Sequence, residues 1–123
     1  MSKPKSYLAK KLPKAFKKKW VNALRSGNFQ QGSSHLFDSD DNTYCCIGVA
    51  GVVCGIPKTK LDGIGFLDSE TKVNLLAEKN KVPKILIESA VESGEKTLAI
   101  HLAEMNDGPN SFKQIAAYIE RYL

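Results

Sequence analysis

Apolar residues recur at helical spacing near the start of the chain. Phe16, Trp20 and Leu24 lie four residues apart, and this spacing predicts an amphipathic helix that turns these side chains toward a core. Proline is tolerated in the first turn of a helix, and a glycine often ends one in a left-handed conformation. We therefore predict a helix over residues 13–26 that ends at Gly27.

The next pattern predicts a hairpin followed by a buried element. Short apolar runs around Leu36 and Tyr44 flank a segment rich in Asp, Asn and Ser, a composition that turns the chain. Residues 45–56 are then almost all small or apolar. This run favours a buried helix of about ten residues ended by Gly55 and Pro57, and its pattern leaves a buried strand open.

The middle of the chain is less regular. Residues 58–67 contain two glycines and predict a loop with one short strand. Polar caps and apolar spacing then predict a helix over residues 68–79. The run KILIES at residues 84–89 is short and β-branched, so strand and helix both stay open there.

Two helices are predicted at the end of the chain. The first covers residues 97–106 and is closed by a turn at residues 106–109. Ser111 and Gln114 form an S-x-x-Q capping box before a second apolar stripe, and we expect the two helices to pair antiparallel. The 123 residues thus predict a mainly α (α+β) fold of about four to five helices with a small β-hairpin, in one globular domain over residues 10–123 after a flexible basic arm at residues 1–9.

Charge is divided unevenly along this chain. Nine of the 18 basic residues precede residue 26, where there is no acidic residue, whereas nine basic and 13 acidic residues follow. A strongly positive end favours an anionic partner at the first helix. The candidate residues for anion or nucleic-acid binding are Lys10, Lys14, Lys17, Lys18 and Arg25.

Two interpretations of these lysines compete. Phosphate binding would use them as a positive strip, with Tyr7 nearby as an aromatic residue. Alternatively they form a solvated face that keeps the protein soluble. Phe16 and Trp20 belong to the apolar stripe, which favours core packing over base stacking.

The cysteines and histidines lack the spacing of a chemical site. Cys45, Cys46 and Cys54 are odd in number and two are adjacent, which argues against a disulfide framework. With His35 and His101 they match no zinc pattern. A Cys45 thiol at a helix start would gain reactivity, but burial opposes this. We predict buried structural thiols and no catalytic residues, metal or cofactor.

The loop after the first helix holds further candidates. Gln30 and Gln31 lie between the helix stop and the hairpin, where amides either read a ligand or tie down backbone groups. The sequence leaves both interpretations open. His35 completes the candidate ligand loop.

Targeting features favour the cytoplasm. The basic start MSKPKSYLAKKLPK has no apolar stretch behind it, unlike a secretory signal. The apolar run at residues 45–56 falls short of the roughly 20 residues that cross a bilayer. We expect a cytoplasmic protein that does not bind membranes.

Three stretches resemble a family of small bacteriophage and prophage proteins: KWVNALRSGNFQQG, LFDSDDNTYCCIGV and LAEMNDGPNSFKQIAAYIE. The family shares Trp-x-x-Ala-Leu-x-Ser-Gly, Gln-Gly, Tyr-Cys-Cys-x-Gly-Val, Asn-Asp-Gly and Ser-Phe in that order. It has no established activity, so the resemblance implies a phage or prophage origin and no mechanism.

The resulting hypothesis is a non-enzymatic phage accessory protein that binds a host macromolecule or an anionic ligand. Host takeover or counter-defence is the role that such an origin implies. One alternative is a nucleic-acid-binding protein that uses the basic first helix. The other is a protein that sequesters a host nucleotide signal in a polar pocket containing Arg25, Gln31 and lysines.

Overall fold

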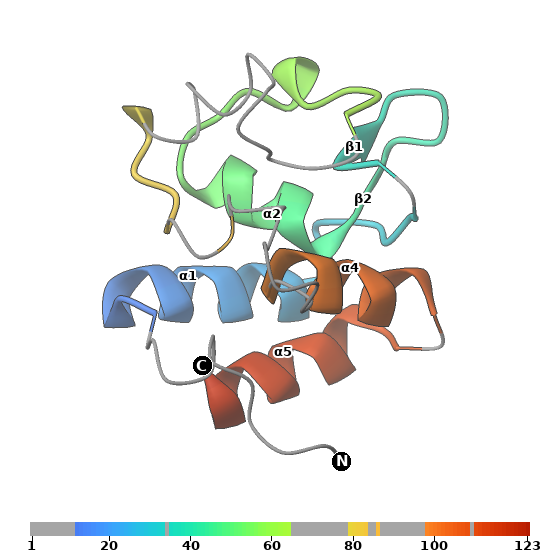
Figure 1. The fold of residues 1–123 in the computed structure, drawn as a ribbon. Coiled ribbons are helices and arrows are strands. Elements are labelled where there is room, and N and C mark those ends of the chain that lie inside the picture. Colours follow the sequence, from blue (N-terminus) through green and yellow to red (C-terminus); the bar gives the residue numbers. More distant parts are fainter. Residues whose placement is uncertain (1–11, 34, 65–78, 84–85, 87–97, 109) are drawn as a thin grey trace, which may run out of the picture.

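The fold is mainly α with a small β-hairpin, as predicted (Figure 1). The computed structural model describes residues 12–33, 35–64, 79–83, 86, 98–108 and 110–123. Four α-helices, a two-stranded sheet and a 3-10 turn lie in this part of the chain: α1 (Lys14–Arg25), β1 (Phe37–Asp38), β2 (Thr43–Tyr44), α2 (Cys46–Val53), η2 (Lys58–Lys60), α4 (Leu98–Asp107) and α5 (Phe112–Tyr122).

Helix α1 lies between α2 and α5 and contacts both (Figure 1). Its predicted apolar stripe is confirmed, since Trp20 is fully buried, Leu24 is buried, and the half-buried Phe16 ring packs on Trp20 with centroids 5.4 Å apart. The Trp20 indole N–H donates a buried hydrogen bond of 2.9 Å to the carbonyl of Cys46. One side chain therefore anchors α1 to the start of α2.

The run at residues 45–56 forms a helix, so the strand alternative is wrong. Helix α2 begins after Cys45, whose sulfur accepts a hydrogen bond from the Gly48 N–H at 3.4 Å. Gly48 lies directly against the backbone carbonyl of Leu36, an approach that only glycine allows. Gly55, with φ of +103°, follows the helix as predicted.

The predicted hairpin is confirmed. Phe37 pairs with Tyr44 and Asp38 with Thr43 in an antiparallel register. The Phe37 and Tyr44 rings pack with centroids 4.8 Å apart, and Phe29 meets Tyr44 edge-on at 5.0 Å. This aromatic group fixes the hairpin to the loop that follows α1.

The two C-terminal helices are also confirmed, with bounds shifted by a residue. Both hydrogen bonds of the Ser111–Gln114 capping box are present at the start of α5. Helices α4 and α5 run in opposite directions (Figure 1), and α5 packs chiefly on α1. The Leu12 N–H donates to the Leu123 carbonyl at 3.1 Å, which ties the start of the described chain to its end.

Several predicted segments lie outside the described residues: the arm at residues 1–9, almost all of the helix expected over 68–79, and most of the 84–89 run. Within residues 58–64, the described part of the loop that follows α2, the expected strand is reduced to one bridge between Asp62 and Phe37. No helix in the described ranges is long and apolar enough to cross a membrane.

Candidate functional site

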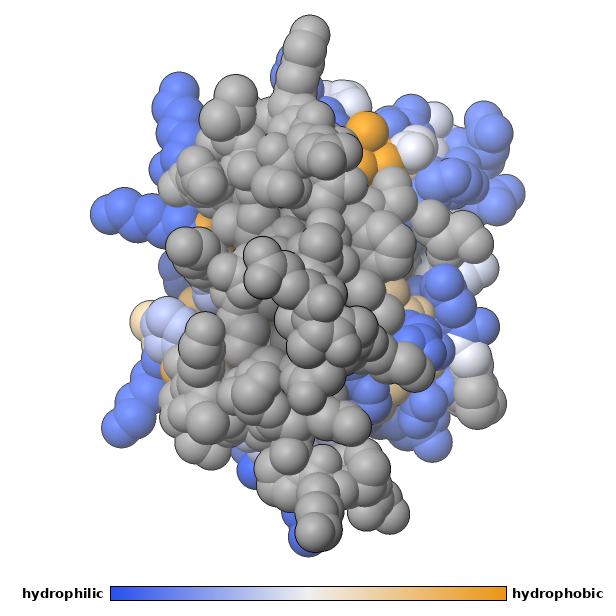
Figure 2. All heavy atoms as spheres, viewed as in Figure 1, coloured by the Kyte–Doolittle hydropathy of each residue, from blue (hydrophilic) through white to orange (hydrophobic). Residues whose placement is uncertain are grey.

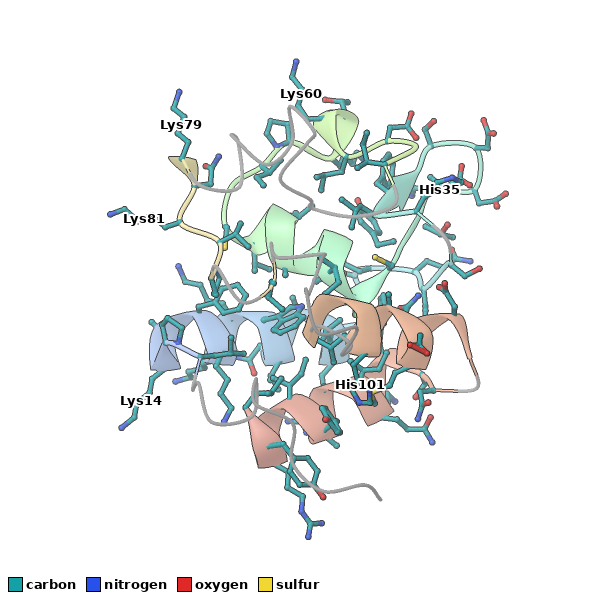
Figure 3. The ribbon with its side chains drawn as sticks, viewed as in Figure 1. Lys14, His35, Lys60, Lys79, Lys81 and His101 are labelled. Atoms are coloured by element: carbon teal, nitrogen blue, oxygen red, sulfur yellow. The ribbon has the colours of Figure 1, made fainter. Side chains whose placement is uncertain are left out.

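The outer face of α1 carries a strip of three lysines, Lys14, Lys17 and Lys18, which we call the lysine strip. Lys14 and Lys18 are exposed and Lys17 is half-buried. The strip borders a shallow hollow of about 210 Å³ that Val21, Asn22 and Glu120 complete. Lys14 projects outward from the first turn of α1 (Figure 3).

Arg25, predicted to bind anions, is engaged within the protein. Its guanidinium donates two hydrogen bonds to the Glu120 carboxylate, at 3.0 and 3.3 Å. The hydrogen bond and charge of Arg25 lower the pKa of Glu120. Because the pair is exposed, it adds little to stability, but it offsets the negative charge of Glu120 beside the lysine strip.

Two lysines of the strip, Lys14 and Lys18, lie where positive charge is unfavourable for the helix, whereas Lys17 is close enough to Glu120 for its charge to help lower the pKa of that carboxyl. The first turn of α1 contains Lys14 and no acidic residue, although the positive end of the helix dipole favours carboxylates there. Lys14 and Lys18 are also one helical turn apart, a spacing at which like charges repel. The stability of α1 therefore does not explain these lysines.

The two described aromatic residues of α1 do not form a stacking platform, and Tyr7 lies outside the described residues. Trp20 has no exposed surface, and Phe16 packs against it. Trp20 belongs to the core and Phe16 packs against it, as their spacing predicted. Lys10, the remaining basic candidate, lies outside the described residues.

Gln31, which the sequence left undecided, ties down backbone groups. Its amide nitrogen donates to the carbonyl of Asn110 at 2.8 Å and contacts the carbonyl and side-chain oxygens of Asn106 at 3.3 Å. Its amide oxygen accepts a bond from the N–H of Phe112 at 2.9 Å. Both ends of the Gln31 amide thus hold the corner between α4 and α5.

Asn106 is the partner that sequence reasoning missed, having placed it only in a turn. It lies in the last turn of α4 at 4% exposure. Its side-chain oxygen accepts a bond from the N–H of Cys46 at 3.1 Å, and its nitrogen donates to the carbonyl of Gly32 at 2.7 Å. The sequence feature that could have indicated this role is an asparagine on the inner face of a helix whose other inner residues are apolar.

The other loop candidates lie apart from the lysine strip. The Gln30 side chain is exposed, and its carbonyl accepts a bond from the N–H of Tyr44 at 2.9 Å. His35 lies by the hairpin, 3.7 Å from the carboxylate of Asp38. Figure 3 places His35 and Lys14 on opposite sides of the view.

The thiols are suited to a structural role. All three are free; Cys45 and Cys46 are buried, whereas Cys54 is only half-buried, which corrects the expectation for that residue. Burial raises the pKa of Cys45 to about 11 and that of Cys46 well above 9.0. A raised pKa disfavours the nucleophilic thiolate. Among the described residues, no group of three or more His, Cys, Asp or Glu is placed to hold a metal.

A second hollow, of about 430 Å³, lies beside Arg25 at the start of α5. Its lining combines two cationic side chains, a partly buried aromatic ring and several polar groups. The residues are Leu24, Arg25, Ser26, Gly27, Phe29, Gln31, Ser111, Phe112 and Lys113.

Comparison with known proteins finds one family. A family model described as a domain of unknown function, DUF8296, matches residues 12–58. No curated protein and no solved structure matches the chain. The matched stretch covers α1, the hairpin, α2 and the η2 residue Lys58.

The residues that carry the sequence motifs converge in this structure. Trp20, Gln31 and Cys46 lie within the matched stretch. Their hydrogen bonds lead to one another or to Asn106 and Phe112 further along the chain. These motif residues therefore belong to one internal hydrogen-bonded network, whereas the lysine strip lies on the surface, outside that network.

Proposed function

We propose that this protein is a non-enzymatic binding module that holds an anionic partner on the lysine strip of α1. One observation carries the proposal: three lysines line a hollow on α1, and Lys14 lies in the first turn, where positive charge is unfavourable for folding. Departures from local electrostatic preference are expected at functional sites. An anionic partner would neutralise the strip and relieve that repulsion.

The test is a paired charge reversal. Lys14→Glu with Lys18→Glu changes the two exposed members of the strip and leaves the half-buried Lys17 in place. Lys58→Glu with Lys60→Glu is the matched control, because it makes the same charge change at the exposed turn η2. Binding to immobilised heparin and to a fluorescent DNA duplex is measured in low salt.

We expect the strip variant to lose about tenfold or more in affinity, and the control to lose less, since electrostatic binding depends on where the charges lie. Circular dichroism verifies that both variants are folded. Equal losses in the two variants would mean that net charge alone attracts polyanions. Unchanged binding in the strip variant would refute the proposal.

A second candidate function is favoured by the hollow at the start of α5. Arg25, Gln31 and Lys113 line it together with the Phe29 ring, and its volume is in the range of small-molecule sites. Cationic side chains and an aromatic ring suit a nucleotide, so this hollow supports sequestration of a nucleotide signal. Arg25 would then be shared between Glu120 and the ligand.

That alternative predicts a bound molecule. The protein purified from host cells and then denatured should release a nucleotide detectable by mass spectrometry, and Lys113→Glu should reduce the amount while Lys58→Glu should not. No released nucleotide, together with no thermal stabilisation by added nucleotides, would exclude it.

We further propose a phage or prophage origin and action in the host cytoplasm on a host macromolecule, including host takeover or counter-defence. The resemblance of the three motif stretches supports the origin. Affinity purification from infected cells, with both protein and nucleic acid identified, tests the partner. If the Lys14→Glu, Lys18→Glu variant recovers the same proteins and nucleic acids as the parent in equal amounts, the partner does not bind through the lysine strip.

A further inference from the structure

Positive charge continues beyond α1 onto a neighbouring segment. Lys19, on the same helix, is near enough to Cys54 for its charge to oppose the rise in the pKa of that thiol. The next residue, Gly55, is packed so that a Cβ there would lie 3.2 Å from the side-chain oxygen of Asn80. Residues 54 and 55 thus connect α1 to the segment that contains Asn80.

Two exposed lysines, Lys79 and Lys81, flank Asn80. Figure 3 shows both projecting from the same edge of the molecule as Lys14. With Lys19 they form what we call the second lysine row. The sequence did not indicate this row, because Lys19 and Lys79 are 60 residues apart and are connected in the structure through residues 54 and 55 at the end of α2.

Negative charge gathers elsewhere on the described surface. Asp38, Asp40 and Asp41 belong to the hairpin and its turn, and Asp62 is bridged to Phe37 within the same hairpin. His35 marks this region on the side of the view opposite Lys14 (Figure 3). Hydrophilic residues cover both of these edges (Figure 2). The described molecule therefore presents a basic edge and, opposite it, a hairpin edge where four aspartates lie with Lys58, whose ammonium is 5.4 Å from the centroid of the Phe37 ring.

We infer that the partner is a nucleic-acid duplex whose phosphate backbone crosses from the lysine strip to the second lysine row. This inference rests on the proposed function and names its partner. A duplex is a rigid polyanion with regularly repeated phosphates, so it engages two separate rows at once. The acidic hairpin repels the duplex and orients the basic edge toward it.

The fold also decides how the duplex is contacted. Because α1 is flanked by α2 and α5, it does not stand out as a free helix of the kind that enters a major groove. The aromatic residues of α1, Phe16 and Trp20, pack in the core. Contact is therefore with phosphates, and binding is independent of sequence.

The test measures the salt dependence of duplex binding by the full chain. For B-DNA the logarithm of the binding constant falls with the logarithm of salt concentration by about 0.9 for each phosphate neutralised. Lys79→Gln with Lys81→Gln should lower that slope by about 2. Lys58→Gln with Lys60→Gln, which removes the same charge from η2, should leave it unchanged. Lys19→Gln alone is a second variant and should lower it by about 1.

Each contrary result is distinguishable. The salt slope could stay at the parent value in both the Lys79→Gln, Lys81→Gln variant and the Lys19→Gln variant. If Lys14→Glu with Lys18→Glu still abolishes binding in that case, the duplex does not cross two rows, and the proposed function remains intact. Tighter binding to polyglutamate than to duplex overturns the choice of partner. Affinities that differ more than about tenfold between unrelated duplexes overturn sequence independence. If Lys14→Glu with Lys18→Glu leaves binding to every polyanion unchanged, both proposals are overturned.

Discussion

Asn106 is the residue on which several elements depend. Its side chain reaches the first N–H of α2 and the carbonyl of Gly32, while Gln31 extends the same network to the first N–H of α5. These backbone groups are far apart in sequence and have no secondary-structure partner at those positions. A buried amide can satisfy a donor and an acceptor at once, which explains a polar residue at 4% exposure.

Asn106→Ala should therefore destabilise the protein by about 2 to 3 kcal/mol, because it leaves a buried N–H and a part-buried carbonyl without partners. Urea unfolding followed by circular dichroism measures the change. Asn28→Ala is the control, because Asn28 is exposed and its backbone N–H, bonded to Ser26, is unaffected by the substitution. If the two variants are equally stable, the hydrogen bonds of Asn106 contribute no more to the free energy of unfolding than hydrogen bonds to water would.

At the scale of elements, local pattern was enough where one face of a helix is buried and its ends are marked. The apolar stripe and Gly27 located α1, and the Ser111–Gln114 box located the start of α5. The pattern of α2 could not separate helix from strand, because the helix is buried on nearly every side. The contacts between elements were not predictable either. In the sequence Gln31 and Asn106 have the composition of turn residues, and only the folded chain places their amides in contact.

Two glycines of helix α2 can be used to test whether close backbone packing requires glycine at these positions. Gly48→Ala places a methyl group against the carbonyl of Leu36 and should cost about 3 kcal/mol, because backbone cannot move aside as a side chain can. Gly51→Ala is a matched control on the same helix: its nearest neighbour would be a side-chain atom of Leu61 at 3.4 Å. We expect Gly51→Ala to be neutral or to stabilise by up to about 1 kcal/mol through helix propensity.

Thermal unfolding of the two variants checks this prediction. If Gly48→Ala and Gly51→Ala unfold at the same temperature, α2 has room to shift away from the hairpin. The close approach of Gly48 to Leu36 would then not be what requires glycine. A large loss for Gly51→Ala instead would place the tight contact on the Leu61 side of the helix.

On the scale of the whole molecule, the two sets of groups that the structure separates should respond to mutation in opposite ways. The internal network of Trp20, Gln31, Cys46 and Asn106 holds the elements together. The lysine strip lies at the surface, where Lys14 opposes the helix dipole and repels Lys18. Loss of the network should lower stability, whereas loss of the strip should lower only binding.

Lys14→Glu alone should accordingly raise the free energy of unfolding by about 0.5 to 1 kcal/mol in low salt, because a carboxylate suits the start of a helix and an acidic side chain at position 14 attracts Lys18 one turn later, whereas glutamates at both positions would repel each other as the lysines do. Added salt screens both effects, so the gain should shrink at 1 M NaCl. Lys60→Glu, at the exposed turn η2, reports what the change in net charge contributes by itself. A Lys14→Glu variant less stable than the parent would mean that Lys14 supports the fold, and its unfavourable placement would no longer argue for a partner. A variant that is more stable and yet binds polyanions less tightly would show that this surface is maintained for binding at the expense of stability, as expected for a functional site.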